Sequence, residues 1–357
     1  MIKCIDRENK FIEIFNPKTG LYARSGVMDG GKDTGVDPFM RGFPALIDVG
    51  VMGWCVHGAT GFCMMGGVQC YQSGLNVKTE NMSLENFKRI VDECKGKTYQ
   101  FALGGRGDVD QHKNFEDILA YCQQNGIVPN FTSSGFGFTD RIVQTCKRYC
   151  GAIAISWYRQ AHTSRAIDML IRAGVKTNIH YVLGNNSIEE AIQRLKENSF
   201  PKGINAVIFL LHKPVGLGSE KNVLKMDNPL LSEFFSLIDE QTFDFKVGFD
   251  SCSVPAILNL TNNIDRDSID TCEGGRYSAY IDAEINMMPC SFDNEDKRWS
   301  VSLNEFSIEE AWNSKQFNDF RGYFRTSCPD CEDRHACMGG CPICPQIVLC
   351  DSEDHRG

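Results

Sequence analysis

The sequence lacks the features that would place the protein in a membrane, outside the cell or on nucleic acid. No apolar run approaches the roughly 18 residues of a membrane-spanning helix. The opening segment, MIKCIDRENK, is polar and of mixed charge, unlike a secretory signal. The net charge is -9, and Lys and Arg form no cluster. We therefore expect a cytoplasmic protein with neither a membrane nor a nucleic-acid partner.

Cysteine, in contrast, is abundant, with 17 residues in a chain of 357. In a protein of this length without an export signal, so many cysteines favour metal clusters over disulfides. The hydrophobic fraction of 42% is ordinary for a globular protein, and the length allows one large α/β domain or two domains.

The first group of cysteines lies in residues 47–74, where an apolar run leads to Cys55, Cys63 and Cys70 with glycines among them. Thiolates in a Gly-rich loop directly after a strand suit a soft metal or an iron–sulfur cluster. Three cysteines on a cube of four irons leave one iron open to a small molecule. The alternatives are a zinc knuckle and buried thiols that bind no metal.

The middle of the chain alternates between strand and helix patterns from about 45 to 262. We expect strands at 45–52, 99–104, 127–132, 152–157, 175–183, 206–211 and 245–249. Helices are expected between them at 83–95, 114–125, 140–150, 164–173, 187–197 and 228–240, with a capping box formed by Ser187 and Glu190. This alternation predicts an α/β fold with parallel strands.

Two flanking regions complete the predicted organisation. Residues 1–44 are expected to form a hairpin at 11–27, with its turn at 16–20, and a loop that leads into the first core strand. Residues 263–357 are expected to form a separate domain in which helices become sparse and cysteines dense. The predicted domains are therefore 1–44, 45–262 and 263–357.

Gly-rich and polar clusters follow the predicted strands, at the edge where parallel α/β folds place their sites. Each cluster alone is typical of an ordinary turn, but their coincidence at one edge favours a site. Candidate general bases on or near these strands are Asp108, Asp110, His112, His180, His212 and Asp250. We prefer His212 and Asp250 as the catalytic pair, because both directly follow late strands.

The C-terminal region carries the second concentration of cysteines, at Cys272, Cys290, Cys328, Cys331, Cys337, Cys341, Cys344 and Cys350. Short spacings such as that between Cys328 and Cys331 let one loop direct two thiolates at one metal centre, and longer gaps suit ligands of different centres. Two structural zinc sites with four thiolates each are the alternative.

Both cysteine-rich regions resemble one family. The α/β run with three cysteines after its first strand resembles the radical S-adenosylmethionine (SAM) enzymes, and the spacing Cys328-x2-Cys331-x5-Cys337-x3-Cys341 is similar to the SPASM extension of that superfamily. The resemblance covers nearly the whole chain. It implies a partial (β/α)6 TIM-like barrel of radical SAM type with an N-terminal β-hairpin, a Cys-rich SPASM domain, three [4Fe–4S] clusters and bound SAM.

In the barrel, the resemblance implies that Cys55, Cys63 and Cys70 hold the SAM-binding cluster, although their spacing is Cx7Cx6C and the usual loop is Cx3Cx2C. The remaining positions implied to bind SAM are Tyr71, Gly104, Gly105, Arg106, Gly107, Ser156, Leu183, Gly184 and Asn185. Arg106 stands where the family's GGE-type segment has Glu.

In the tail, the family pattern assigns Cys272, Cys290 and Cys341 to a first auxiliary cluster. It assigns Cys328, Cys331, Cys337 and Cys350 to a second. Cys344 is an alternative to Cys350, and Cys252 is a candidate fourth ligand of the first cluster, a thiol facing substrate, or a buried thiol. Ile285 stands where the family has Gly.

The implied function is cleavage of SAM to a 5′-deoxyadenosyl radical and hydrogen abstraction from a ribosomally synthesised peptide, which leads to oxidation, a crosslink or thioether, or epimerisation. The expected partners are a precursor peptide, an electron donor of the flavodoxin or ferredoxin type, and a separate leader-binding protein. The alternatives are a radical SAM dehydrogenase of sugars or aminoglycosides, and a non-catalytic iron–sulfur or zinc protein.

Overall fold

The computed structural model describes residues 1–58, 61–326, 328, 330–347 and 349–350. Its centre is a sheet of ten strands in the order β12-β11-β10-β9-β8-β7-β6-β13-β14-β15. Seven consecutive strands are parallel: β6 (Leu46–Met52), β7 (Gln100–Gly105), β8 (Val128–Ser133), β9 (Ile153–Ser156), β10 (Thr177–Leu183), β11 (Ala206–Leu211) and β12 (Lys246–Phe249).

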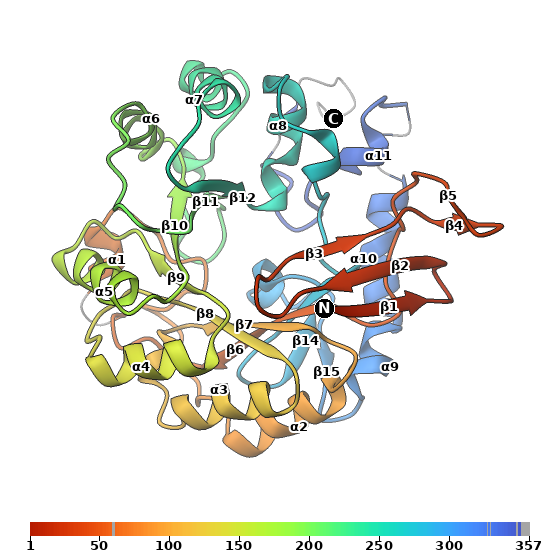
Figure 1. Ribbon diagram of the computed structural model, residues 1–357, viewed down its shortest axis with the longest axis horizontal. Coiled ribbons are helices and arrows are strands. Elements are labelled where there is room, and N and C mark those ends of the chain that lie inside the picture. Colours follow the sequence, from red (N-terminus) through yellow and green to blue (C-terminus); the bar gives the residue numbers. More distant parts are fainter. Residues whose placement is uncertain (59–60, 327, 329, 348, 351–357) are drawn as a thin grey trace.

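Helices connect these strands and line the outside of the curved sheet (Figure 1). They are α2 (Leu84–Cys94), α3 (Phe115–Gln124), α4 (Asp140–Tyr149), α5 (Ala161–Arg172), α6 (Ile188–Lys196) and α7 (Pro229–Glu240). The predicted alternation of strand and helix is therefore confirmed, and the parallel order follows from the crossover helices.

Local sequence signals explain where several helices begin. Ser83 caps α2 by accepting a hydrogen bond from the backbone N of Asn86, and Asn228 caps α7 in the same way. The predicted capping box at Ser187 is wrong, because the Ser187 hydroxyl bonds backbone groups of the preceding strand and turn instead. The Glu190 carboxylate forms ion pairs with Arg159 and Arg194 instead of bonding the backbone N of Ser187.

The C-terminal region continues the central sheet. Strand β13 (Ser278–Ile281) pairs in parallel with β6, and β14 (Asn286–Met288) and β15 (Val301–Ser302) extend the sheet as antiparallel strands. Four helices belong to this half or lead into it: α8 (Val254–Leu260), α9 (Ile308–Trp312), α10 (Lys315–Thr326) and α11 (Arg334–Cys337). The prediction of sparse helices after 263 is wrong for 308–326, where α9 and α10 follow each other closely.

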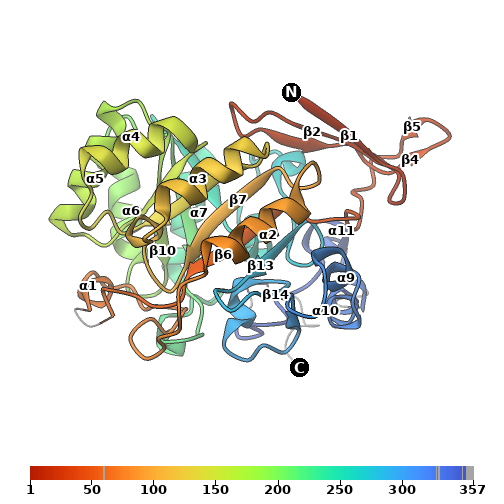
Figure 2. The same cartoon turned by 90° about the horizontal axis from the view of Figure 1, so that it is seen from below.

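The N-terminal region forms a small antiparallel sheet of β1 (Ile2–Asp6), β2 (Phe11–Phe15) and β3 (Tyr22–Arg24), followed by the short pair β4 (Met28–Asp29) and β5 (Lys32–Asp33). The hairpin at 11–27 is present, and β1 was not expected. Phe15 stacks on Tyr99, with a centroid distance of 5.1 Å, so the small sheet packs where β6 and β7 begin. Figure 2 shows this sheet and α1 (Phe62–Met65) at opposite ends of the parallel strands.

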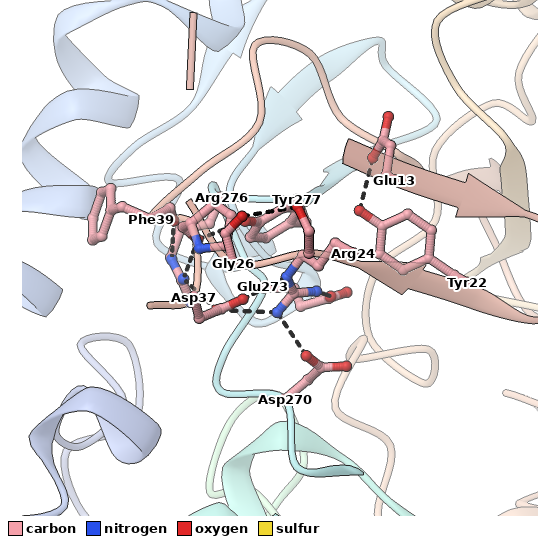
Figure 3. Close-up of polar contacts among 12 residues, drawn as sticks. Glu13, Tyr22, Arg24, Gly26, Asp37, Phe39, Asp270, Glu273, Arg276 and Tyr277 are labelled. Atoms are coloured by element: carbon pink, nitrogen blue, oxygen red, sulfur yellow. Dashed lines mark hydrogen bonds and ion pairs between the residues drawn. The ribbon is translucent and has the colours of Figure 1, made fainter. Parts of the chain in front are cut away.

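Arg24 fastens the small sheet to the segment around Cys272 (Figure 3). Its guanidinium lies 2.7 Å from Asp37, 2.6 Å from Asp270 and 3.5 Å from Glu273. No helix among the described residues is long and apolar enough to cross a membrane.

Candidate active site

A cavity of about 1420 Å³ runs along the inside of the sheet. At the carboxyl ends of the strands its lining includes Cys55, Cys63 and Cys70, and at the amino ends it includes Tyr22 and Tyr99. Four further cysteines line the same space: Cys252, Cys272, Cys290 and Cys341. The fold therefore brings the thiols of the first loop and of the C-terminal region to one chamber.

Gly74 allows Cys55 and Cys70 of the first thiol group to lie close to its backbone. A Cβ at this position would lie 3.3 Å from the Cβ of Cys55 and 3.4 Å from the Sγ of Cys70, and its backbone N donates to that same Sγ at 3.4 Å. Burial raises the pKa of Cys55 to about 11, and negative charge on Asp108 and Cys70 adds to the rise. Bound metal would supply the positive charge that holds such thiols as thiolates.

The segment Gly104–Asp108 lies directly against this loop. Gly105 has φ +114°, and a Cβ there would lie 2.4 Å from the carbonyl oxygen of Met52. A Cβ on Gly107 would lie 2.5 Å from the carbonyl oxygen of Trp54. Both glycines therefore permit a backbone approach that a side chain would block. Between them, Arg106 donates from Nε to the carbonyl oxygen of Gln72 at 3.2 Å.

Asp108 is held by two partners at the cavity wall. Its Oδ2 lies 2.9 Å from Nε2 of His57 and accepts from the Ser134 hydroxyl at 2.5 Å, while its Oδ1 accepts from the Ser134 backbone N at 2.8 Å. Burial and the charge of Asp108 raise the pKa of the neighbouring Asp110 to about 6. Sequence reasoning missed His57, whose one available signal was its position between two of the loop cysteines.

The other predicted SAM-binding positions divide into two sets. Tyr71 and Ser156 line the cavity. Leu183, Gly184 and Asn185 lie outside its described lining. A Cβ on Gly184 would lie 2.9 Å from the Cβ of His212, so this segment supports the cavity wall from behind.

The C-terminal thiols form two further groups. Gly274 packs against the first, because a Cβ on it would lie 3.5 Å from the Sγ of Cys272 and 3.7 Å from the Cβ of Cys290. Burial raises the pKa of Cys290, and negative charge on Cys272, Cys341 and Cys252 raises it further. Cys252 also hydrogen-bonds Cys341. Cys252, the candidate fourth thiol, therefore lies beside Cys341.

Cys337 lies at the centre of the other group. Burial raises its pKa to about 11, and the thiolates of Cys350, Cys328 and Cys331 add to the rise. Cys344 is fully buried, and its backbone N donates to the Sγ of Cys341 at 3.3 Å. The placement thus favours Cys350 over Cys344 as the fourth member of this group.

Comparison with known proteins identifies a domain in the C-terminal region. Residues 272–344 match the family model SPASM, described as an iron-sulfur cluster-binding domain. The chain carries a SPASM domain. Of the predicted tail ligands, Cys252 lies before this domain and Cys350 after it. A comparison with curated proteins gives no match.

Solved structures share the fold of most of the chain. Streptococcus suis SuiB bound to precursor peptide SuiA has 14% identity and a TM-score of 0.66, covering 89% of this chain and 77% of that one. Native anSMEcpe with bound AdoMet and Cp18Cys peptide has 15% identity and a TM-score of 0.61, covering 87% and 91%. At such identities the likeness establishes the fold, which is the radical SAM fold followed by a SPASM domain.

The donor set fits iron–sulfur clusters. Among the described residues, no three His, Cys, Asp or Glu side chains converge as ligands of one metal ion. The thiols of the first loop and of the first tail group instead line one cavity, and a [4Fe–4S] cube distributes its ligand sulfurs over separate irons. The soft, all-cysteine composition of each group is also the one such clusters require.

The two residues of the preferred catalytic pair, His212 and Asp250, interact with different partners. His212 Nε2 lies 3.0 Å from the carbonyl oxygen of Ser219, and burial lowers its pKa. Asp250 forms an ion pair with Lys213 and accepts hydrogen bonds from the backbone N of Leu211 and the Ser253 hydroxyl. Both predicted residues line the cavity, but each has a different partner. Sequence reasoning missed Lys213.

The remaining candidate bases take different positions. His180 lines the cavity, and burial lowers its pKa to about 4. His112 lies outside the described lining, with Nε2 3.0 Å from the carbonyl oxygen of Met82. Asp110 accepts from the Ser133 hydroxyl at 2.6 Å.

Proposed function

We propose that this protein is a radical SAM enzyme that modifies a ribosomally synthesised peptide in the cytoplasm. The observation that carries the proposal is the shared cavity, which joins the three-cysteine loop to the SPASM thiols. SAM bound at a reduced cluster supplies a hydrogen-abstracting radical. An electron carrier that does not act on a substrate needs no chamber of this size between its metal sites.

Residues of the barrel would bind and orient the cofactor. Cys55, Cys63 and Cys70 would ligate the first [4Fe–4S] cluster. The backbone of Gly104–Gly107 lies beside this loop and, with Tyr71 and Ser156, offers polar groups to SAM. Asp108, held by His57 and Ser134, presents a carboxylate at the same wall and can hold a cationic amino group. Leu183, Gly184 and Asn185 remain proposed residues of the adenine-binding side. They would act indirectly, by supporting the cavity wall.

Residues of the tail would hold two auxiliary clusters. Cys252, Cys272, Cys290 and Cys341 would ligate the first, and Cys328, Cys331, Cys337 and Cys350 the second. Because the first group lines the cavity, its cluster would lie close to substrate and could accept an electron from it. An oxidation or a new crosslink follows from such a route, and hydrogen return without net electron loss gives epimerisation.

A peptide substrate is supported by the fold and by the cavity. SuiB was solved with its precursor peptide, and anSMEcpe with the Cp18Cys peptide. The cavity extends from the cysteine loop to Tyr22 of the small N-terminal sheet, which gives an extended chain a long wall to contact. His212 and Asp250 are the proposed catalytic residues. A flavodoxin or ferredoxin would donate electrons, and a separate protein would bind the leader.

Iron and sulfide analysis of anaerobically reconstituted protein, with a SAM-cleavage assay under dithionite, tests the proposal. Three clusters predict about 12 irons per chain and release of 5′-deoxyadenosine. The variant Cys55→Ala/Cys63→Ala/Cys70→Ala should keep about 8 irons and release none. The control Cys122→Ala, a buried thiol outside the described lining, should match the parent. Zinc in place of iron would overturn the proposal.

A further inference from the structure

Lys213 is a buried cation in the wall of the cavity. It lies two residues after the end of β11, and only 5% of its surface is exposed. Its Nζ donates to the carbonyl oxygen of Leu211 at 3.0 Å and forms an ion pair with Asp250. The ammonium also lies 4.8 Å from the centre of the Phe292 ring. Carboxylate, carbonyl and ring face together compensate the cost of burying the charge.

These partners place Lys213 beside the first SPASM thiol group. Asp250 is two residues before Cys252, and Phe292 is two residues after Cys290, so both contacts reach the backbone that carries proposed ligands. Lysine and thiols line the same cavity. Burial lowers the pKa of Lys213, but Asp250, Cys252 and Cys341 outweigh burial and raise it overall, so their negative charges lie close to the ammonium.

We propose that Lys213 is a positioning residue that raises the reduction potential of the cluster held by Cys252, Cys272, Cys290 and Cys341, and that Asp250 opposes it. The inference rests on the proposed function in one respect, namely that these thiols hold a cluster. One-electron reduction adds a negative charge to the cluster and no proton. A nearby ammonium stabilises that charge and a nearby carboxylate destabilises it, most strongly where water is excluded.

The test is a potentiometric titration with dithionite, followed by electron paramagnetic resonance, on the full-length chain with Cys55, Cys63 and Cys70 replaced by Ala. This background removes the signal of the first cluster and leaves the two tail clusters. In it, Lys213→Met, which keeps the length but removes the charge, should shift one midpoint potential downward. Asp250→Asn should shift the same midpoint upward. The second tail cluster should not move and serves as the internal reference.

Three further variants separate charge from structure. Lys213→Arg keeps the charge and should stay near the parent midpoint. The double variant Lys213→Met/Asp250→Asn removes both charges and should fall between the two single variants. Lys221→Met, at an exposed position in the same connection, should change nothing. A general loosening of the site would instead move both single variants in the same direction, or lower their iron content along with their potential.

Each outcome is decisive. Opposite shifts of one midpoint support the inference. Shifts in the same direction, or none in protein with about 8 irons, overturn it while leaving the proposed function intact. A tail without iron would overturn the inference together with the assignment of the tail clusters. SAM cleavage by the parent chain, assayed in parallel, reports on the proposed function independently.

Discussion

Gly105 holds a backbone conformation that a side chain would oppose. Its φ is +114°, and a Cβ would lie 2.4 Å from the carbonyl oxygen of Met52, which also accepts the backbone hydrogen bond of Arg106. Gly105→Ala should therefore lower the free energy of unfolding by roughly 2–4 kcal/mol, from strain and steric overlap combined. Urea unfolding measures the change.

Gly104 provides the matched control for that substitution. It lies next to Gly105 in the same strand, and a Cβ there would meet nothing within 4 Å. Gly104→Ala should leave the unfolding midpoint close to that of the parent, even where the added methyl hinders SAM. Equal stability of the two variants would contradict the strain assigned to Gly105.

Asp48 should make stability depend on pH. Burial, with a contribution from the negative charge of Glu273, raises its pKa to about 7. The folded state therefore holds the proton more tightly than the unfolded state, and this stabilisation is full below pH 4 and is lost as pH rises through 7. Asp48→Asn should raise the free energy of unfolding at pH 8 by about 4 kcal/mol and leave it nearly unchanged at pH 4.

Urea titrations at both pH values test this difference, with the exposed Asp168→Asn as the control. The control should show no such contrast between pH 4 and pH 8. An equal gain for Asp48→Asn at both values would mean that the carboxylate is not protonated in the folded protein at low pH.

The family resemblance implied the cysteine groups, and the fold brings Cys272, Cys290 and Cys341 to one cavity. Sequence reasoning did not predict His57 or Lys213, whose roles depend on partners brought near by the fold. Lys213 meets Asp250 only because β11 and β12 are neighbours, and His57 meets Asp108 across the loop. The same limit explains why His212 and Asp250 were paired in sequence but have separate partners.

At the scale of elements, the cap of α9 gives a clean test of local stabilisation. Ser307 accepts from the backbone N of Glu310, and the Glu310 carboxylate accepts from the backbone N of Ser307, which completes a capping box. Ser307→Ala should cost about 1 kcal/mol. Hydrogen exchange of the α9 amides should quicken, while exposed Ser164→Ala within α5 should have no such effect. Unchanged exchange in α9 would contradict the role of the cap.

The parallel core was predictable element by element, since each strand and helix carries its own apolar period and end signals. Helix α2 matches its predicted range within a residue, and its buried face includes Phe87, Val91 and Cys94. The pairing of β13 with β6 was not predictable, because no local sequence pattern specifies which distant strands pair or in what register. Helix α10 was not predicted, although its apolar face buries Phe317, Phe320 and Phe324.

At the scale of the molecule, the small N-terminal sheet and the segment around Asp270 meet at the cavity wall. The small N-terminal sheet contributes Tyr22 to the lining, and the segment beginning at Asp270 contributes Asp270 and Cys272. Any loosening between these parts therefore affects the wall of the chamber as well as stability. Arg24 is the residue on which this junction depends most, because it bridges both parts (Figure 3).

Arg24→Ala should loosen the junction. The arginine side chain is 8% exposed, and its removal leaves Asp37, Asp270 and Glu273 without their shared cation. The partial exposure of these carboxylates moderates the loss, so we expect about 1–3 kcal/mol. Limited proteolysis should cut the N-terminal 44 residues faster than in the parent, because the sheet would open more often.

The surface pair of Arg141 and Glu116 supplies the control for this experiment. Its atoms are 3.5 Å apart, and the arginine side chain is 86% exposed, so Arg141→Ala should leave both stability and cleavage unchanged. If Arg24→Ala matched this control, the junction would be held by its other contacts, such as the packing of Phe15 on Tyr99 and of Phe11 on Tyr277, and the ion-pair network would only add specificity. Faster cleavage with unchanged iron content would locate the loosening at the sheet and leave the cluster sites intact.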